Sequence, residues 1–174
     1  IKLYAGIFTI LRETCVIFGA GPIGLLCLQA AMVAGVAYTI VVGIAERCLE
    51  KARELGATLI INGKEKNISQ QIKTFTGGLG VDVYLDAAAI LVALFGKPVT
   101  LDAVDLVQRE ITIKEIVCYR HIFPEVIKLI ESKQMDVEQL ITRKTKLDDI
   151  VKDGFEASAS DPSEIKILID LGSN

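Results

Sequence analysis

The sequence predicts an α/β protein built on a doubly wound parallel sheet. Short aliphatic segments alternate with helix-length segments along most of the chain, and a glycine-rich turn joins the first of each kind. The composition agrees, because 51% of the 174 residues are hydrophobic while only 6% are aromatic. Such aliphatic segments are typical of strands that are buried on both faces.

Each expected element has a local signal. The strands are short apolar runs bounded by glycine or polar residues, and we expect them at residues 14–18, 38–42, 59–61, 81–86 and 90–95. Helical periodicity and terminal glycines predict helices at residues 23–34, 46–55 and 68–75. Charge increases after Cys118, where we expect a helix beginning near Pro124, a helix around residues 147–155 and a last strand at 165–171.

One connection is too short for this pattern. Only three alanines separate the strand ending at Asp86 from the one starting at Ile90, whereas parallel neighbours need a crossover of about a dozen residues. Either the two strands form an antiparallel hairpin, or the numbering closes over residues that are absent near 89/90. We favour absent residues.

The turn at residues 19–24 reads Gly-Ala-Gly-Pro-Ile-Gly, a GxGxxG motif between a buried strand and a helix. In this setting Gly19 makes the tight turn, Gly21 lets the backbone approach a pyrophosphate, and Gly24 lets helix and strand pack closely. Pro22 suits the first helical turn, and the amide of Ile23 lies at its positive end. The motif predicts a Rossmann dinucleotide-binding domain; a glycine-rich turn without a ligand is the alternative.

The end of the second strand bears on which dinucleotide binds. An acidic residue there would hold a ribose 2′-hydroxyl, but Gly43 occupies the position. Arg47 follows shortly after and could pair with a 2′-phosphate. The pattern therefore slightly favours NADP over NAD, although a solvated charge at a helix start explains Arg47 about as well.

Composition excludes several other functions. A net charge of −3 argues against nucleic acid and anionic membranes as partners. The long uncharged stretch between Glu13 and Glu46 is interrupted by glycines and Pro22, which favours strand, helix and strand over a membrane span. Four scattered cysteines without a CxxC pair, and no visible signal peptide, predict a cytoplasmic protein with reduced thiols and no metal site.

Longer segments carry a family resemblance. Residues 14–24, 49–57 and 77–83 are similar to the cofactor domain of the zinc-dependent medium-chain alcohol and polyol dehydrogenases. Residues 97–101, 119–127, 140–142, 149–151, 154–157 and 165–168 resemble its butanediol dehydrogenase branch, a relative of sorbitol dehydrogenases. The resemblance implies an oxidoreductase that interconverts a secondary alcohol such as butanediol with a ketone such as acetoin.

The resemblance also implies that cofactor binding and catalysis belong to different domains. Zinc and the catalytic residues would belong to an N-terminal catalytic domain, and no position here matches them, so we expect this chain to bind a dinucleotide without catalysing alone. Residues 1–12 would be a linking helix, 13–118 the dinucleotide-binding domain, and 119–174 a segment returning to the catalytic domain. The resemblance also implies absent residues near 12/13 and 89/90, because this family has a glycine-containing loop before the first strand and a helix between the fourth and fifth strands. Backbone near the nicotinamide end would come from Ala87, Ala88, Leu94 and Phe95.

Relatives of this kind form dimers or tetramers, so a homo-oligomer is expected, paired through residues 111–117. Two other functions remain open at this stage. The chain could be a catalytically inactive nucleotide-binding or sensing module, or a Rossmann domain that binds a flavin or S-adenosylmethionine.

Overall fold

A computed structural model describes residues 13–86, 104, 122–161 and 163–172. The first of these parts alternates strands and helices in the expected order. Its elements are β1 (Thr14–Phe18), α1 (Pro22–Val33), β2 (Tyr38–Gly43), α2 (Glu46–Glu54), β3 (Leu59–Asn62), α3 (Ile68–Phe75) and β4 (Val83–Asp86). Glycines end the helices as predicted, since Gly35 and Gly56 follow α1 and α2 with φ of 88° and 96°.

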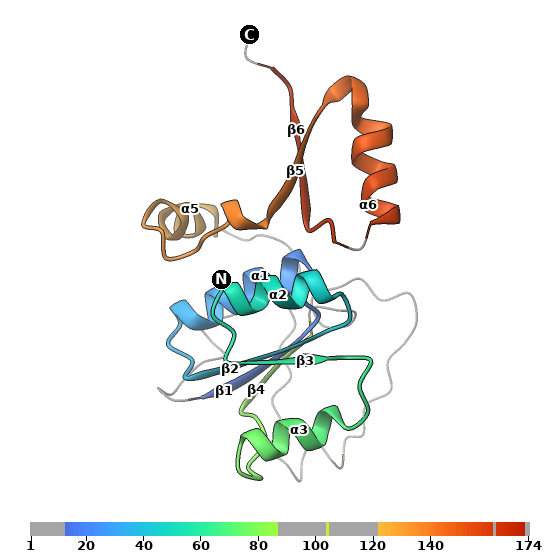
Figure 1. Ribbon diagram of the computed structural model, residues 1–174. Helices are drawn as coiled ribbons and strands as arrows, with labels where there is room; N and C mark the ends of the chain where they lie inside the picture. Colours follow the sequence, from blue (N-terminus) through green and yellow to red (C-terminus); the bar gives the residue numbers. More distant parts are fainter. Residues whose placement is uncertain (1–12, 87–103, 105–121, 162, 173–174) are drawn as a thin grey trace.

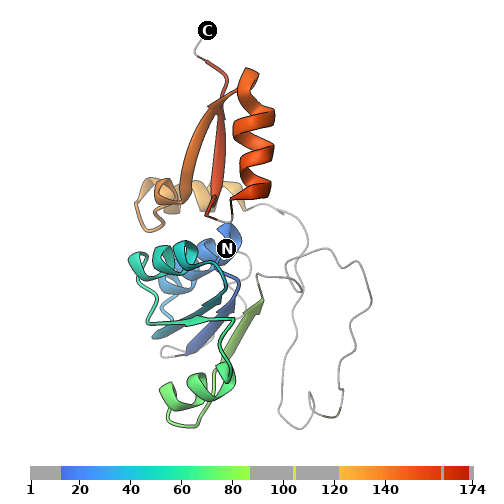
Figure 2. The ribbon, with the colours of Figure 1, turned by 45° about the vertical axis from the view of Figure 1, so that its right-hand side comes forward.

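The four strands form a parallel sheet in the order β3-β2-β1-β4. Helices α1 and α2 cover one face and α3 covers the other (Figures 1 and 2). The chain therefore winds outward from β1 to β3 and then crosses back to β4 on the opposite side of the sheet. This reversal confirms the doubly wound fold, and it defines the switch point at which such sheets bind ligands, beyond the carboxyl ends of β1 and β4.

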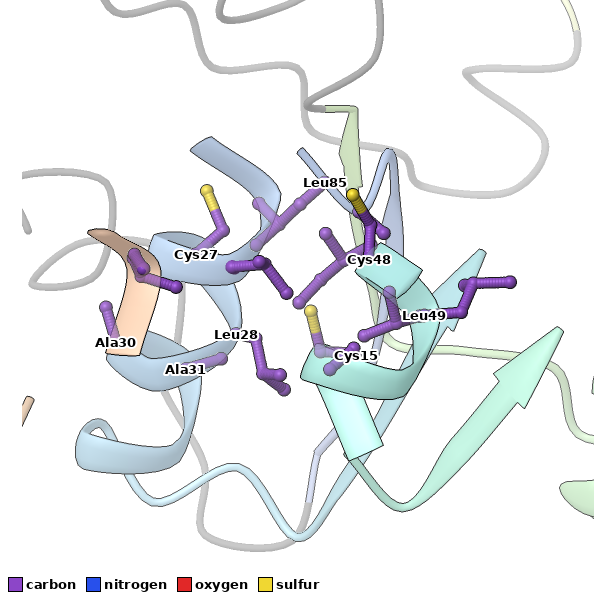
Figure 3. Packing of buried hydrophobic residues seen from close by; sticks show 14 of the residues in the cluster. Cys15, Cys27, Leu28, Ala30, Ala31, Cys48, Leu49 and Leu85 are labelled. Carbon is purple, nitrogen blue, oxygen red and sulfur yellow. The ribbon is translucent and has the colours of Figure 1, made fainter. Parts of the chain in front are cut away.

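The pleat of β1 divides the core into two clusters, because successive side chains point to opposite faces. Cys15 and Ile17 face α1 and α2, while Val16 faces α3, and all three are at most 1% exposed. Figure 3 shows the larger cluster, where side chains from β1, α1, α2 and β4 meet. Burial, with smaller contributions from Cys27 and Glu13, raises the pKa of the Cys15 thiol to about 12.

The described C-terminal part forms a small strand–helix–strand unit. Its elements are α5 (Phe123–Glu131), η1 (Glu138–Leu140), β5 (Ile141–Lys146), η2 (Leu147–Asp149), η3 (Ile150–Glu156), α6 (Ala157–Ser160) and β6 (Lys166–Asp170). Strands β5 and β6 pair in parallel. The helix expected around 147–155 is present, but it passes through 3₁₀ and π turns before a short α segment.

Strand β5 is an element that the apolar patterns did not predict. Its sequence, Ile-Thr-Arg-Lys-Thr-Lys, contains one aliphatic residue, and Thr145 is its one buried position. The strand exists because β6 supplies its hydrogen-bonding partner. Pairing across the sheet has therefore overridden weak local hydrophobicity.

The C-terminal unit packs on the α1/α2 side of the sheet (Figures 1 and 2). Met135, Leu140 and Ile165 join the larger core cluster. The buried side chain of Gln29 in α1 donates to the carbonyl of Asp136 at 3.0 Å and accepts from its N–H at 2.5 Å. These contacts join the C-terminal unit directly to the β1–β4 part of the chain, residues 13–86.

Several expectations lie outside the described residues. These are the linking helix at 1–12, the breaks near 12/13 and 89/90, the strand at 90–95, the pairing segment 111–117 and the domain boundary after 118. Within the described parts, each helix falls short of the length and apolar character that crossing a bilayer requires.

Candidate functional site

The glycine corner, residues 19–24, connects β1 to α1 at the carboxyl edge of the sheet. Gly19 has a φ of 100°, which a residue with a side chain rarely adopts. Its N–H donates to the carbonyl of Val42 at 2.8 Å, so the corner is attached to the neighbouring strand β2. The turn that the motif predicts is present, and its first glycine is required by the backbone.

Gly21 is the N-cap of α1 and borders open space. A Cβ built on Gly21 would have no heavy atom within 4 Å. Pro22 occupies the first helical position, and the amides of Ile23 and Gly24 belong to the first turn, where N–H groups lack intrahelical partners. The helix dipole adds positive potential at the same point, so the corner can accept a phosphate group at close range.

Gly43 ends β2 and lies against the glycine corner. A Cβ at this position would meet the Cβ of Ala20 at 2.7 Å and Cδ2 of Leu49 at 3.0 Å. Packing therefore explains why residue 43 has no side chain, in addition to the electrostatic consequence of lacking a carboxylate. The sequence shows only the loss of charge at this position, because the close approach of Ala20 is a contact between separate segments.

Arg47 lies in the first turn of α2, on the carboxyl side of Gly43. Its Nη1 donates to Oγ of Ser163 at 2.9 Å. The hydroxyl and the N–H of Ser163 both donate to Oδ1 of Asp161, at 2.5 and 2.8 Å. These two bonds lower the pKa of Asp161, and the nearby charges of Arg47 and Arg143 lower it further.

The Arg47–Ser163 contact escaped the sequence analysis. The two residues are 116 positions apart and no motif links them. The predicted site residues thus separate into two groups. Six of them meet at one corner: Gly19, Gly21, Pro22, Ile23, Gly24 and Gly43. Arg47 lies in the first turn of the next helix, α2, along the same edge. Ala87, Ala88, Leu94 and Phe95 lie outside the described residues.

Other features do not add to this site. A groove of about 440 Å³ lies beneath α3, where Phe18 and Tyr84 stack with ring centroids 5.0 Å apart. It opens on the sheet face opposite α1 and is distinct from the glycine corner. Among the residues that the structure describes, His, Cys, Asp and Glu side chains do not gather in any group of three that could hold a metal ion.

The parallel sheet with its switch point and the open glycine corner define the class: a Rossmann-type α/β domain with the geometry of a dinucleotide site. Comparison with known proteins then narrows the class. Residues 22–90 match the family model described as zinc-binding dehydrogenase. The chain is 32% identical to (R,R)-butanediol dehydrogenase of Bacillus subtilis, over 97% of this chain and 52% of that protein.

Further relatives agree. Sorbitol dehydrogenase of Bacillus subtilis is 30% identical over 92% of this chain and 50% of its own length. The crystal structure of 2R,3R-butanediol dehydrogenase from Bacillus subtilis superposes with a TM-score of 0.86 at 30% identity, covering 98% of this chain and 55% of that one. Residues 22–90 thus form a domain of the zinc-binding dehydrogenase family, and the chain is similar along nearly its whole length to zinc-type alcohol and polyol dehydrogenases, of whose length it spans about half.

Proposed function

We propose that this chain is the cofactor-binding part of a zinc-dependent NAD(P)(H) oxidoreductase that interconverts a secondary alcohol or polyol with a ketone, of the butanediol and acetoin type. The observation that carries the proposal is the open space above Gly21 at the start of α1. Relatives named butanediol and sorbitol dehydrogenases support the substrate class.

The chain's own residues bind and orient the dinucleotide. Amides of Ile23 and Gly24 donate to the pyrophosphate, while the absence of a side chain at Gly21 lets the backbone approach it. Gly19 keeps the corner attached to β2 through its bond to Val42. When bound, the dinucleotide supplies the hydride acceptor or donor of the reaction. The residues proposed near its nicotinamide are Ala87, Ala88, Leu94 and Phe95.

We further propose a modest preference for NADP(H). Gly43 places no carboxylate beside the ribose 2′ position, and Arg47 provides a guanidinium on the same edge of the sheet. A 2′-phosphate would therefore meet attraction without repulsion from the strand end.

Zinc chemistry is not assigned to this chain. The chain spans about half the length of its relatives, and we propose that the zinc ligands and the catalytic residues lie elsewhere in the parent enzyme. We therefore propose binding without turnover by this chain alone, and homo-oligomeric assembly of the parent enzyme. A cytoplasmic location is proposed from the sequence, whose four scattered cysteines form no CxxC pair.

The test is a titration of the full chain with NADPH, NADH and S-adenosylmethionine, followed by nicotinamide fluorescence and by melting temperature. We expect both nicotinamide cofactors to bind, NADPH more tightly, and S-adenosylmethionine not to bind. Gly21→Ala and Gly21→Val place increasing bulk in the open space. Since Gly21 has a φ of −72°, which any residue adopts, both variants should fold and lose binding progressively.

The outcomes separate the candidate functions. Nicotinamide binding that Gly21→Val abolishes without changing the circular dichroism spectrum supports the proposal. Binding that persists in Gly21→Val overturns the assigned site. Failure of the wild-type chain to bind either nicotinamide cofactor, or preferential binding of S-adenosylmethionine, overturns the proposed function.

A further inference from the structure

The carboxyl edge of the sheet includes a contact from the C-terminal unit. Helix α2 begins three residues after β2 ends, so its first turn lies beside the end of that strand. The connection between α6 and β6 reaches this turn, where Ser163 accepts a hydrogen bond from Nη1 of Arg47 at 2.9 Å. A residue from the end of the chain thus holds the cation nearest in sequence to Gly43.

The hydroxyl of Ser163 is oriented for this role. It donates to Oδ1 of Asp161 at 2.5 Å, so its lone pairs remain to accept from Arg47. The N–H of Ser163 bonds to the same carboxylate oxygen at 2.8 Å, which restrains the backbone as well. The acceptor offered to Arg47 is therefore fixed by two bonds of its own.

An arginine at an exposed position benefits from such a restraint. Arg47 is exposed on α2, and an unrestrained arginine side chain loses rotamer entropy when it is ordered. A guanidinium carries five N–H donors, so the bond to Ser163 leaves donors for a phosphate. Ordering the side chain before the ligand arrives reduces the entropy lost on binding.

We propose that Ser163 is a positioning residue for cofactor specificity: its hydroxyl holds the Arg47 guanidinium at the end of β2, where Arg47 recognises the 2′-phosphate of NADP(H). The inference rests on the proposed function and deepens it. NADH lacks the 2′-phosphate, so Ser163 contributes to the affinity for NADPH and not to the affinity for NADH. The C-terminal unit thereby takes part in selecting the cofactor.

The experiment measures the ratio of the dissociation constants for NADPH and NADH in the full chain. Ser163→Ala removes the acceptor, and we expect it to weaken NADPH binding by about three- to tenfold, the range of one exposed hydrogen bond, with NADH binding unchanged. Arg47→Ala should abolish the preference for NADPH. Ser163→Thr keeps a hydroxyl and should restore the wild-type ratio to within about twofold.

Ser160→Ala is the matched control. Ser160 lies in α6, three residues before Ser163, and its hydroxyl bonds to the carbonyl of Glu156 at 2.7 Å. The same substitution there should leave both dissociation constants unchanged. A purely structural loss in Ser163→Ala would weaken NADPH and NADH binding equally and would not be rescued by threonine, which overturns the proposed role.

Two failures are distinguishable. If wild-type protein binds both cofactors and Ser163→Ala keeps the wild-type ratio, only the role of Ser163 is overturned. If wild-type protein binds neither cofactor, the proposed function and this inference fall together. A ratio that changes in Ser163→Ala, returns in Ser163→Thr and stays constant in Ser160→Ala supports the inference.

Discussion

The contact between Gly43 and Ala20 yields a prediction that can be worked out in detail. The perturbation is Gly43→Ala, made in the wild-type chain and again in an Ala20→Gly background. In the wild type the new methyl group would lie 2.7 Å from the Cβ of Ala20 and 3.0 Å from Cδ2 of Leu49. Carbon atoms in ordinary contact are about 3.5–4.0 Å apart, so the new group overlaps Ala20 by almost an ångström.

The expected magnitude follows from this overlap. Overpacking of a tight site costs about 1–3 kcal/mol. For a chain of this size each kcal/mol lowers the melting temperature by about 2–4 °C, so Gly43→Ala should melt about 2–12 °C below wild type. In the Ala20→Gly background the nearest atom is gone and Leu49 can turn aside, so the same substitution should cost at least about 1 kcal/mol less.

The assay is urea and thermal unfolding of the four proteins in the cycle, followed by far-UV circular dichroism. Gly21→Ala serves as the control for adding a methyl group at the same corner, because nothing lies within 4 Å of its Cβ. The close approach would be refuted if the double variant lost the sum of the two single unfolding free-energy changes to within about 0.5 kcal/mol. The packing explanation for Gly43 would then be wrong.

Three further predictions concern the core and the C-terminal unit. With a pKa near 12, Cys15 is thiolate in about one molecule in ten thousand at pH 8, against about one in ten at the ordinary value of 9.0. Ellman's reagent should therefore modify Cys15 only after denaturation. Rapid labelling of Cys15 in the native protein would contradict its burial. Gln29→Ala leaves both backbone groups of Asp136 without their side-chain partner and should cost about 1–2 kcal/mol in urea unfolding, whereas Gln71→Ala, at a bond to Glu65 on the surface, should cost under about 0.5 kcal/mol. Hydrogen bonds from Thr142 and Arg143 lower the pKa of Glu164 below its ordinary 4.5. The ionised carboxylate therefore stabilises the fold above pH 4.5, and this contribution disappears as the pH falls through the lowered pKa. Glu164→Gln should melt below wild type at pH 7 and converge with it in acid, and an equal difference at both pH values would argue against these two bonds.

Local sequence determined the secondary structure of residues 13–86 almost completely. Apolar runs, helical periodicity and terminal glycines predicted β1 to β3 and α1 to α3 to within a residue or two, because each signal acts between near neighbours in the chain. The GxGxxG spacing likewise predicted the corner, since Gly19 has a positive φ that favours glycine. A positive φ is a local property of the backbone, and a glycine in the sequence indicates where it occurs.

Tertiary structure decided the contacts between distant segments. The charged strand β5 forms because β6 pairs with it, Gly43 is confined by Ala20, and Arg47 finds Ser163 near the other end of the chain. None of these pairings leaves a periodic trace in the sequence, because each depends on how the connections fold back and not on the residues next to it. The sequence therefore predicts a dinucleotide site at the glycine corner, and the packing of the C-terminal unit determines that Arg47 is held by Ser163.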